Sequence, residues 1–327
     1  MPSIQHISIH AGEKIRTYLH VGTRKNFMPI TIISGHTPGP TLLITAGIHG
    51  CEYPGILAAI ELGRDLSPID IQGTLIILPI TNPTAFTEKV PYIVPEDQKN
   101  LNRVFPGDCK GTLSEQIAAM IMQDIIPHID YHVDLHSGDL PEELTPYVYY
   151  PGKANQDDTV KIAQSMALTL NIPYMVESNA SSGAYNASAL AGVPSILIER
   201  GGMGHCCPHY VKDFKEDIQR LLAHFHMIAS TSTHLQNHLP IPTHRPRLLT
   251  NVNYIAAPIS GCWISNVHAG HIGKKGDQLG IITDIFGNTL KVITSEYDYV
   301  VLYLETGLSI KESCPLIAYA HLPYQSS

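Results

Sequence analysis

Short apolar runs alternate with amphipathic stretches along about the first 225 residues of the chain. Runs rich in leucine, isoleucine and valine predict buried strands over residues 41–45, 74–79, 132–136 and 195–199. Apolar positions at helical spacing predict helices over residues 54–66, 113–126, 159–170 and 210–228. This alternation is typical of an α/β domain, which we place at residues 1–235.

The pattern changes after that domain. From residue 230 the sequence becomes polar and rich in proline, so we predict a linker over residues 236–252. Three histidines in this polar stretch are irregularly spaced, and a metal site there is the less favoured interpretation: His234, His238 and His244. Short apolar runs interrupted by glycine then predict a small all-β domain over residues 253–327.

Size and charge narrow the class of protein. The chain has 327 residues, of which 44% are hydrophobic and 15% charged, enough to bury one large and one small core. A net charge of -8 without a basic cluster argues against nucleic acid as a partner. Neither a secretory signal nor an apolar run of about 18 residues is present, so we expect a cytoplasmic protein that does not bind membranes.

The six cysteines show no CxxC spacing, which argues against a disulfide scaffold or a cysteine zinc site and is typical of a reducing compartment. The adjacent pair Cys206 and Cys207 could be redox-active, but we favour their interpretation as two residues of a glycine-rich loop.

Candidate chemistry begins at GIHGCEYPG (residues 47–55), between a predicted strand and a predicted helix. Ligands bind at such junctions in α/β sheets. His49 and Glu52 offer a nitrogen and an oxygen that can share one metal ion, and zinc accepts both. Taken alone, this spacing is equally compatible with an ordinary helix start.

A second candidate lies in VDLHSG (residues 133–138). Strand alternation places His132, Asp134 and His136 on one face, which is costly in a buried strand unless something binds there. His136 is nearest the strand end and is the third candidate metal ligand. We expect Asp134 to orient it, and His132 to be a hydrogen-bonded core residue.

Two further segments offer groups for binding and catalysis. Asn102 and Arg103, in NLNRVFPG, could hold a substrate carboxylate, although an arbitrary arginine is usually a surface residue. Glu199 ends a predicted strand, where it could serve as a general base or equally pair with Arg200.

Together and in this order, GIHGCEYPG, NLNRVFPG, VDLHSG and IERGG resemble the succinylglutamate desuccinylase and aspartoacylase family, a branch of the zinc carboxypeptidase-like superfamily. The resemblance implies a mixed, mostly parallel sheet between helices. It also implies roles for the candidate residues: one zinc ion per chain on His49, Glu52 and His136, a substrate carboxylate on Asn102 and Arg103, and activation of the metal-bound water by Glu199.

The chain departs from the family at one position. Relatives often carry an arginine that polarises the scissile carbonyl, whereas this chain has Tyr92, so Tyr92 or Lys89 would have to supply the donor. The C-terminal segment is similar to the small β domain of these deacylases and to biotinyl-lipoyl barrels, but no lysine sits in a tight hairpin, so we expect no carrier role.

These features predict zinc-dependent hydrolysis of an amide bond in a small, carboxylate-bearing substrate, with deacylation of an N-acyl amino acid as the leading hypothesis. A carboxypeptidase and a metal-retaining binding module with little activity are the alternatives. The partner we expect is a small-molecule substrate, and the sequence leaves a homo-oligomer open.

Overall fold

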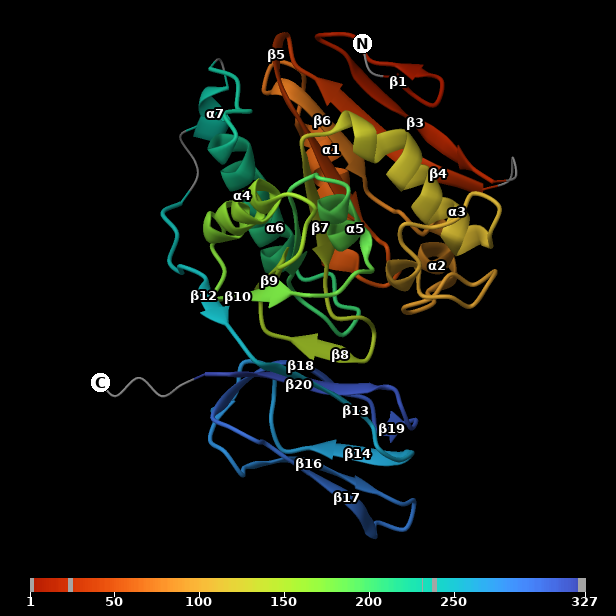
Figure 1. Cartoon of the computed structure of the whole chain (residues 1–327), viewed down its shortest axis with the longest axis vertical. Coiled ribbons are helices and arrows are strands. Elements are labelled where there is room, and N and C mark those ends of the chain that lie inside the picture. Colours follow the sequence, from red (N-terminus) through yellow and green to blue (C-terminus); the bar gives the residue numbers. More distant parts are fainter. Residues whose placement is uncertain (1–2, 23–25, 231, 237–239, 323–327) are drawn as a thin grey trace.

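The computed structural model describes residues 3–22, 26–230, 232–236 and 240–322. Its centre is a nine-stranded sheet in the order β12-β10-β9-β11-β7-β5-β6-β4-β3 (Figure 1). In chain order these strands are β3 (Lys14–Val21), β4 (Asn26–Ser34), β5 (Thr37–Ala46), β6 (Gln72–Leu78), β7 (Tyr131–His136), β9 (Tyr147–Pro151), β10 (Tyr174–Ser178), β11 (Ser195–Glu199) and β12 (Arg247–Leu249).

The pairings within β12-β10-β9 and within β11-β7-β5-β6 are parallel. Those of β9 with β11, and of β4 with both β6 and β3, are antiparallel. The sheet is therefore mixed and mostly parallel, as the family resemblance implied.

Helices cover both faces of this sheet. Neighbouring residues of β5 point to opposite faces, so Leu42 and Leu43 belong to different apolar clusters. The Leu42 cluster includes α1 (Tyr53–Asp65), α4 (Asp157–Leu168) and α6 (Pro208–His224). The Leu43 cluster includes α3 (Leu113–Met120), its π-helical continuation (Ile121–Ile125) and α5 (Ala184–Leu190). Burial of these apolar faces on both sides stabilises the layered arrangement.

Shorter elements complete the α/β part. They are β1 (Ser3–Ile4), β2 (Ile7–Ser8), α2 (Pro83–Glu88), α7 (Thr233–Gln236) and two 3₁₀ turns, Leu101–Arg103 and Ile126–His128. No helix among the described residues is long and apolar enough to cross a bilayer.

The C-terminal β region consists of two antiparallel sheets around an apolar core that includes Trp263. One sheet contains β13 (Val252–Ala256), β20 (Pro315–His321), β18 (Tyr299–Glu305) and β15 (Ile272–Gly273). The other contains β17 (Thr289–Thr294), β16 (Gln278–Thr283), β14 (Gly261–Ser265) and β19 (Ser309–Ile310).

A strand from the α/β part joins this region. β8 (Glu142–Leu144) follows β7 in the chain and pairs antiparallel with β18, with Glu142 opposite Glu305. In Figure 1, β8 lies between the central sheet and the C-terminal strands. The same ladder therefore connects the end of β7 to the C-terminal region.

The predicted strands and helices all correspond to observed elements, with two differences. The last helix ends at His224 rather than at residue 228, because Phe225 leaves the helical conformation and His226 adopts a positive φ of 56°. Within the predicted linker, Arg247–Leu249 form β12, which extends the sheet beside β10. His238 lies outside the described residues, and the division into domains stays a prediction.

Candidate metal centre and active site

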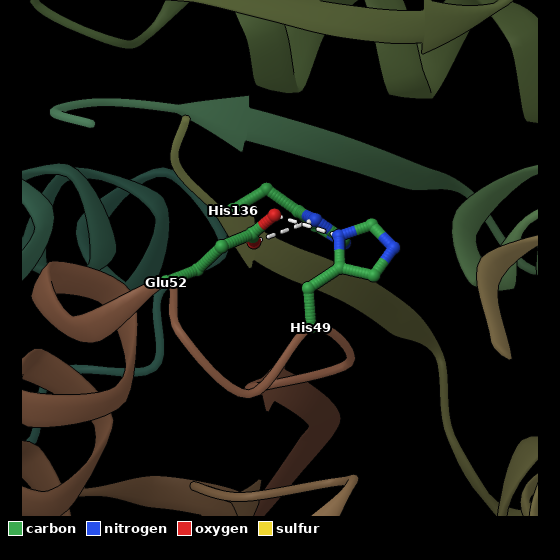
Figure 2. A group of neighbouring side chains, drawn as sticks. All are labelled: His49, Glu52 and His136. Carbon is green, nitrogen blue, oxygen red and sulfur yellow. Dashed lines mark hydrogen bonds and ion pairs between the residues drawn. The ribbon is translucent and has the colours of Figure 1, made fainter. Parts of the chain in front are cut away.

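The three candidate ligands lie at or just beyond the ends of two neighbouring parallel strands. His49 lies in the loop after β5, and Glu52 immediately precedes α1. His136 is the last residue of β7, which pairs with β5 in parallel. Because both strands end at the same edge of the sheet, the three side chains converge there (Figure 2).

The Glu52 carboxylate lies between the two imidazoles. Its Oε1 is 2.6 Å from Nδ1 of His49, and its Oε2 is 2.9 Å from Nδ1 of His136. One ligand atom from each of the three residues falls within 4.8 Å of the others, and all three residues are buried. Burial alone would raise the pKa of Glu52, but His136 and His49 lower it to about 2, so this carboxylate is ionised.

The second ring nitrogen of each imidazole, Nε2, also has a hydrogen-bonding partner. Nε2 of His136 lies 3.1 Å from Oδ2 of Asp134, and Nε2 of His49 lies 3.1 Å from Oδ1 of Asn100. These contacts turn both Nδ1 atoms toward Glu52, the arrangement that orients metal-binding histidines in proteins. The contact with Asp134 was expected. Asn100 was missed, because the sequence does not show which amide of the loop reaches His49.

The contacts of Asp134 continue into the core. Thr45 donates a hydrogen bond from Oγ1 to Oδ1 of Asp134 (2.6 Å) and also contacts Nε2 of His132 (2.8 Å). The other ring nitrogen of His132 lies 2.9 Å from Oγ of Ser188. His132 is thus a fully hydrogen-bonded core residue, as expected, and supports Asp134 from behind.

Glu199 lies beside the candidate metal centre. It ends β11 and is paired with His136 across the parallel ladder. Its Oε2 is buried and has no hydrogen-bond partner among the described residues. Arg200, the alternative partner, instead donates from Nε to Asp217 (2.7 Å). Burial raises the pKa of Glu199 well above its usual value, and the negative charges of Glu52 and other nearby carboxylates raise it further, whereas His136 lowers it.

The candidate carboxylate-binding residues lie in the 3₁₀ turn Leu101–Arg103. Asn102 is buried, and its Oδ1 accepts a hydrogen bond from the backbone of Ala184 (3.0 Å), which fixes the turn against α5. Arg103 is exposed and forms no ion pair with any described residue. Among the described residues its guanidinium donates only to the Asn102 carbonyl (3.3 Å), so most of its donors are available to a ligand.

Tyr92 lies over the ring of His49, with their centroids 6.0 Å apart. Its backbone has a positive φ of 62°, which is unusual for a residue with a side chain. The backbone N–H donates to Oδ2 of Asp139 (2.8 Å), and the hydroxyl donates to Oε2 of Glu142 (3.4 Å). Lys89, the other proposed donor, is exposed.

Asp139 and Glu142 were not singled out in the sequence. Burial, followed by the charge of Glu52, raises the pKa of Asp139 to about 6 and that of Glu142 to about 8. The only sequence signal for Asp139 and Glu142 was their position shortly after VDLHSG (residues 133–138). The sequence does not show that β8 pairs with β18.

The charge of Glu199 also acts on several tyrosines, of which Tyr254 and Tyr303 belong to the C-terminal β region. Tyr254 of β13 and Tyr149 of β9 share a hydrogen bond between their hydroxyls (2.9 Å). The charge of Glu199 contributes to the raised pKa values of Tyr147, Tyr254 and Tyr303, in each case after the larger effect of burial. The C-terminal region thus places aromatic side chains beside the candidate base.

The donor set suits zinc. Two imidazole nitrogens and one carboxylate oxygen are the protein ligands of many catalytic zinc sites, which keep a further position for water or substrate. This is the one group of this kind found among the described residues. Cys206 and Cys207 form no disulfide, and Cys207 precedes the first residue of α6.

Comparison with known proteins identifies the family of the chain. Residues 38–225 match the model of the succinylglutamate desuccinylase/aspartoacylase catalytic domain. The chain belongs to this family. A curated relative is the N-alpha-acetyl-L-2,4-diaminobutyric acid deacetylase of Halomonas elongata, 30% identical over 248 residues that cover 74% of this chain and 67% of the relative.

Solved structures of other proteins share the fold. The product-bound ectoine utilization protein EutE (DoeB) from Ruegeria pomeroyi superposes with a TM-score of 0.85, at 23% identity and with 97% and 98% of the two chains covered. A succinylglutamate desuccinylase/aspartoacylase from Rhodobacter sphaeroides gives a TM-score of 0.81, at 23% identity and 96% coverage of both chains. The alignments cover the C-terminal β region as well as the α/β part.

Proposed function

We propose that the chain is a zinc-dependent hydrolase that removes the acyl group from a small N-acyl amino acid. The observation that carries this proposal is the convergence of His49, Glu52 and His136 beside the unpartnered carboxylate of Glu199. A family of deacylases and a curated deacetylase relative support the same reaction, hydrolysis of a carbon–nitrogen bond other than a peptide bond.

His49, Glu52 and His136 would hold one zinc ion. When bound, zinc supplies a Lewis acid that polarises a carbonyl and lowers the pKa of water. Glu199 accepts the proton of the attacking water at Oε2 and returns it to the leaving amine. The raised pKa of Glu199 favours the protonated form, which returns the proton to the amine. A divalent cation nearby would lower this pKa and favour the carboxylate, which accepts the proton of water.

In this proposal the substrate is held by residues of the 3₁₀ turn Leu101–Arg103 and by Tyr92. Arg103 presents free guanidinium donors that fit a carboxylate, and the fixed turn of Asn102 determines where they lie. The Tyr92 ring lies against His49, and its hydroxyl can donate to the substrate once it turns away from Glu142. We place this reaction in the cytoplasm, a prediction that rests on the sequence alone.

The test compares substrates on the purified protein. We expect about one zinc ion per chain by metal analysis, together with hydrolysis of N-acetyl amino acids, loss of activity on chelation, and recovery when zinc is restored. Faster cleavage of dipeptides than of N-acetyl amino acids would favour the carboxypeptidase alternative. Zinc binding without hydrolysis of any amide would favour the binding module and contradict the proposal.

A further inference from the structure

A strained turn carries Tyr92 into the candidate active site. Tyr92 has a positive φ of 62°, and the N–H of Ile93 donates a hydrogen bond to the carbonyl of Pro91 (2.7 Å). A hydrogen bond across one residue of positive φ is the mark of the rarer form of γ-turn, which is strained. Such strain persists only where the surrounding structure holds the backbone in place, and it is concentrated at functional sites. The contacts of this turn therefore identify the residues that hold Tyr92.

The first of these contacts is made by a buried carboxylate. Asp139 is 0% exposed, and its Oδ2 accepts the hydrogen bond from the N–H of Tyr92 (2.8 Å). Its Oδ1 accepts a second hydrogen bond from the N–H of Leu140 (2.7 Å). In the part of the chain that the structure describes, no ion pair joins Asp139 to a basic residue. Both oxygens thus bind backbone groups, which is how an aspartate fixes a turn.

A second contact joins the turn to the loop that carries a candidate metal ligand. Asn82 is 1% exposed, and its Nδ2 donates to the carbonyls of Ile93 and Ile48, both at 3.4 Å. Ile48 immediately precedes His49 in the chain. The last residue of the turn is therefore connected to the His49 loop through Asn82, while its central residue is held by Asp139.

Asp139 also connects the turn to the strand of another candidate ligand. It follows shortly after His136, the last residue of β7. The segment between them is fixed, because Gly138 donates from its N–H to the carbonyl of Gly201 (3.0 Å) and approaches the Glu142 carbonyl so closely that a Cβ would lie 2.4 Å from its oxygen. Only glycine permits this approach. Asp139 is therefore held by a rigid backbone at a fixed position relative to His136.

The turn determines where the phenol of Tyr92 lies. The ring meets that of His49 edge to face, with the centroids 6.0 Å apart. A negative φ would redirect the Cα–Cβ bond of Tyr92 and move the ring away from His49. We propose that Asp139 is a positioning residue of the active site, which holds the γ-turn through the N–H of Tyr92 and so keeps the phenol beside His49. This inference rests on the proposed hydrolase function, in which Tyr92 donates to the substrate.

The experiment is a double-mutant cycle on the zinc-loaded protein, with an N-acetyl amino acid as the substrate. Asp139→Ala should lower kcat about tenfold or more at unchanged zinc content, with a smaller effect on KM, because the N–H of Tyr92 loses its buried acceptor and the phenol its position. In Tyr92→Gly the turn is unstrained and carries no phenol. Adding Asp139→Ala to Tyr92→Gly should therefore change kcat by less than about twofold.

Two further variants separate positioning from a general structural role. Asp139→Asn has one oxygen for two N–H groups, so we expect an intermediate loss of kcat, about threefold. Asp130→Ala is the matched control, because Asp130 precedes the other end of β7 and also accepts a backbone hydrogen bond, from the N–H of Thr41 (2.7 Å). It should leave kcat unchanged.

An unchanged kcat in Asp139→Ala would overturn the inference, as would an equal loss in the wild-type and Tyr92→Gly backgrounds. If the wild type hydrolyses no amide, the proposed function fails, and amide hydrogen exchange measured by NMR decides the inference instead. The amide of Tyr92 should exchange about tenfold faster or more in Asp139→Ala than in the wild type, and equal rates would contradict the inference. If Asp139→Ala does not fold, Asp139→Asn takes its place, and its smaller loss should again disappear in the Tyr92→Gly background.

Discussion

Glu199 and His136 occupy paired positions at the ends of the neighbouring parallel strands β11 and β7. The candidate base and one candidate metal ligand are therefore both held on strands, and the hydrogen bonds between these strands fix their relative position. Sites built on strands hold their side chains more accurately than sites built on loops. This relationship leads to the first of four predictions.

Replacing Glu199 should abolish catalysis without removing the metal. Glutamine at this position keeps the shape but cannot accept the proton of water, so we expect kcat for Glu199→Gln to fall about 10²- to 10⁴-fold. Zinc content, measured by metal analysis, should stay at the wild-type level because Glu199 is not among the ligands. Glu312→Gln, an exposed change in the C-terminal region, is the control. Near-normal turnover in Glu199→Gln would show that another group is the base.

Asn100 should matter for zinc affinity. It contacts Nε2 of His49 and also accepts a hydrogen bond from the backbone of Asn102 (2.8 Å). Loss of such an outer partner typically weakens metal binding about 10- to 100-fold, which we expect for Asn100→Ala in a competition with a chelator. Asn100→Asp keeps both acceptor contacts and should restore most of the affinity. Equal affinities in all three proteins would mean that Asn100 does not orient His49.

Arg103 should select for a free carboxylate. In the wild type we expect an N-acetyl amino acid to be hydrolysed much faster than its carboxamide, because the guanidinium binds an anion with charge-assisted hydrogen bonds. Arg103→Gln should reduce this preference about 10-fold or more, chiefly through KM. Steady-state kinetics on both substrates measure the effect. A preference that survives in Arg103→Gln would assign the carboxylate to another residue.

Glu142 should make stability depend on pH. Its pKa is raised from 4.5 to about 8, mainly by burial, so the folded chain keeps a proton that the unfolded chain releases. The stability that this proton confers is complete below pH 4.5 and is lost as the pH rises to about 8. Glu142→Gln stays neutral and should lose less free energy of unfolding than the wild type over that interval, by about 1 kcal/mol or more. Urea unfolding with a chelator present, at about pH 5 and about pH 9, measures the difference. Parallel pH profiles for the two proteins would contradict it.

Much of the fold could be predicted from periodicity. The four apolar strands lie at the centre of the sheet and are buried on both faces, so they appear as continuous apolar runs. β3 was missed because it lies at the edge of the sheet and is largely polar and exposed. β4, the next strand inward, was missed because Pro29 interrupts its apolar run. α5 was missed because its residues are mostly small and carry no clear apolar stripe.

The candidate site was only partly visible in the sequence. His49, Glu52 and His136 stand out because polar residues at the ends of apolar strands need a reason to be there. Asn100 could not be distinguished from Asn102, since the choice depends on how one turn of 3₁₀ helix is oriented. Asp139, Glu142 and the tyrosines were missed because their proximity arises from contacts between segments far apart in the chain.

The pairing of β8 with β18 bears on how substrate preference can change among relatives. Glu142 comes from the first half of the chain, and its opposite residue Glu305 from the last. An exchange of only one half between two family members would pair β8 of one parent with β18 of the other. Chimeras designed to transfer specificity should therefore carry both strands from the same parent.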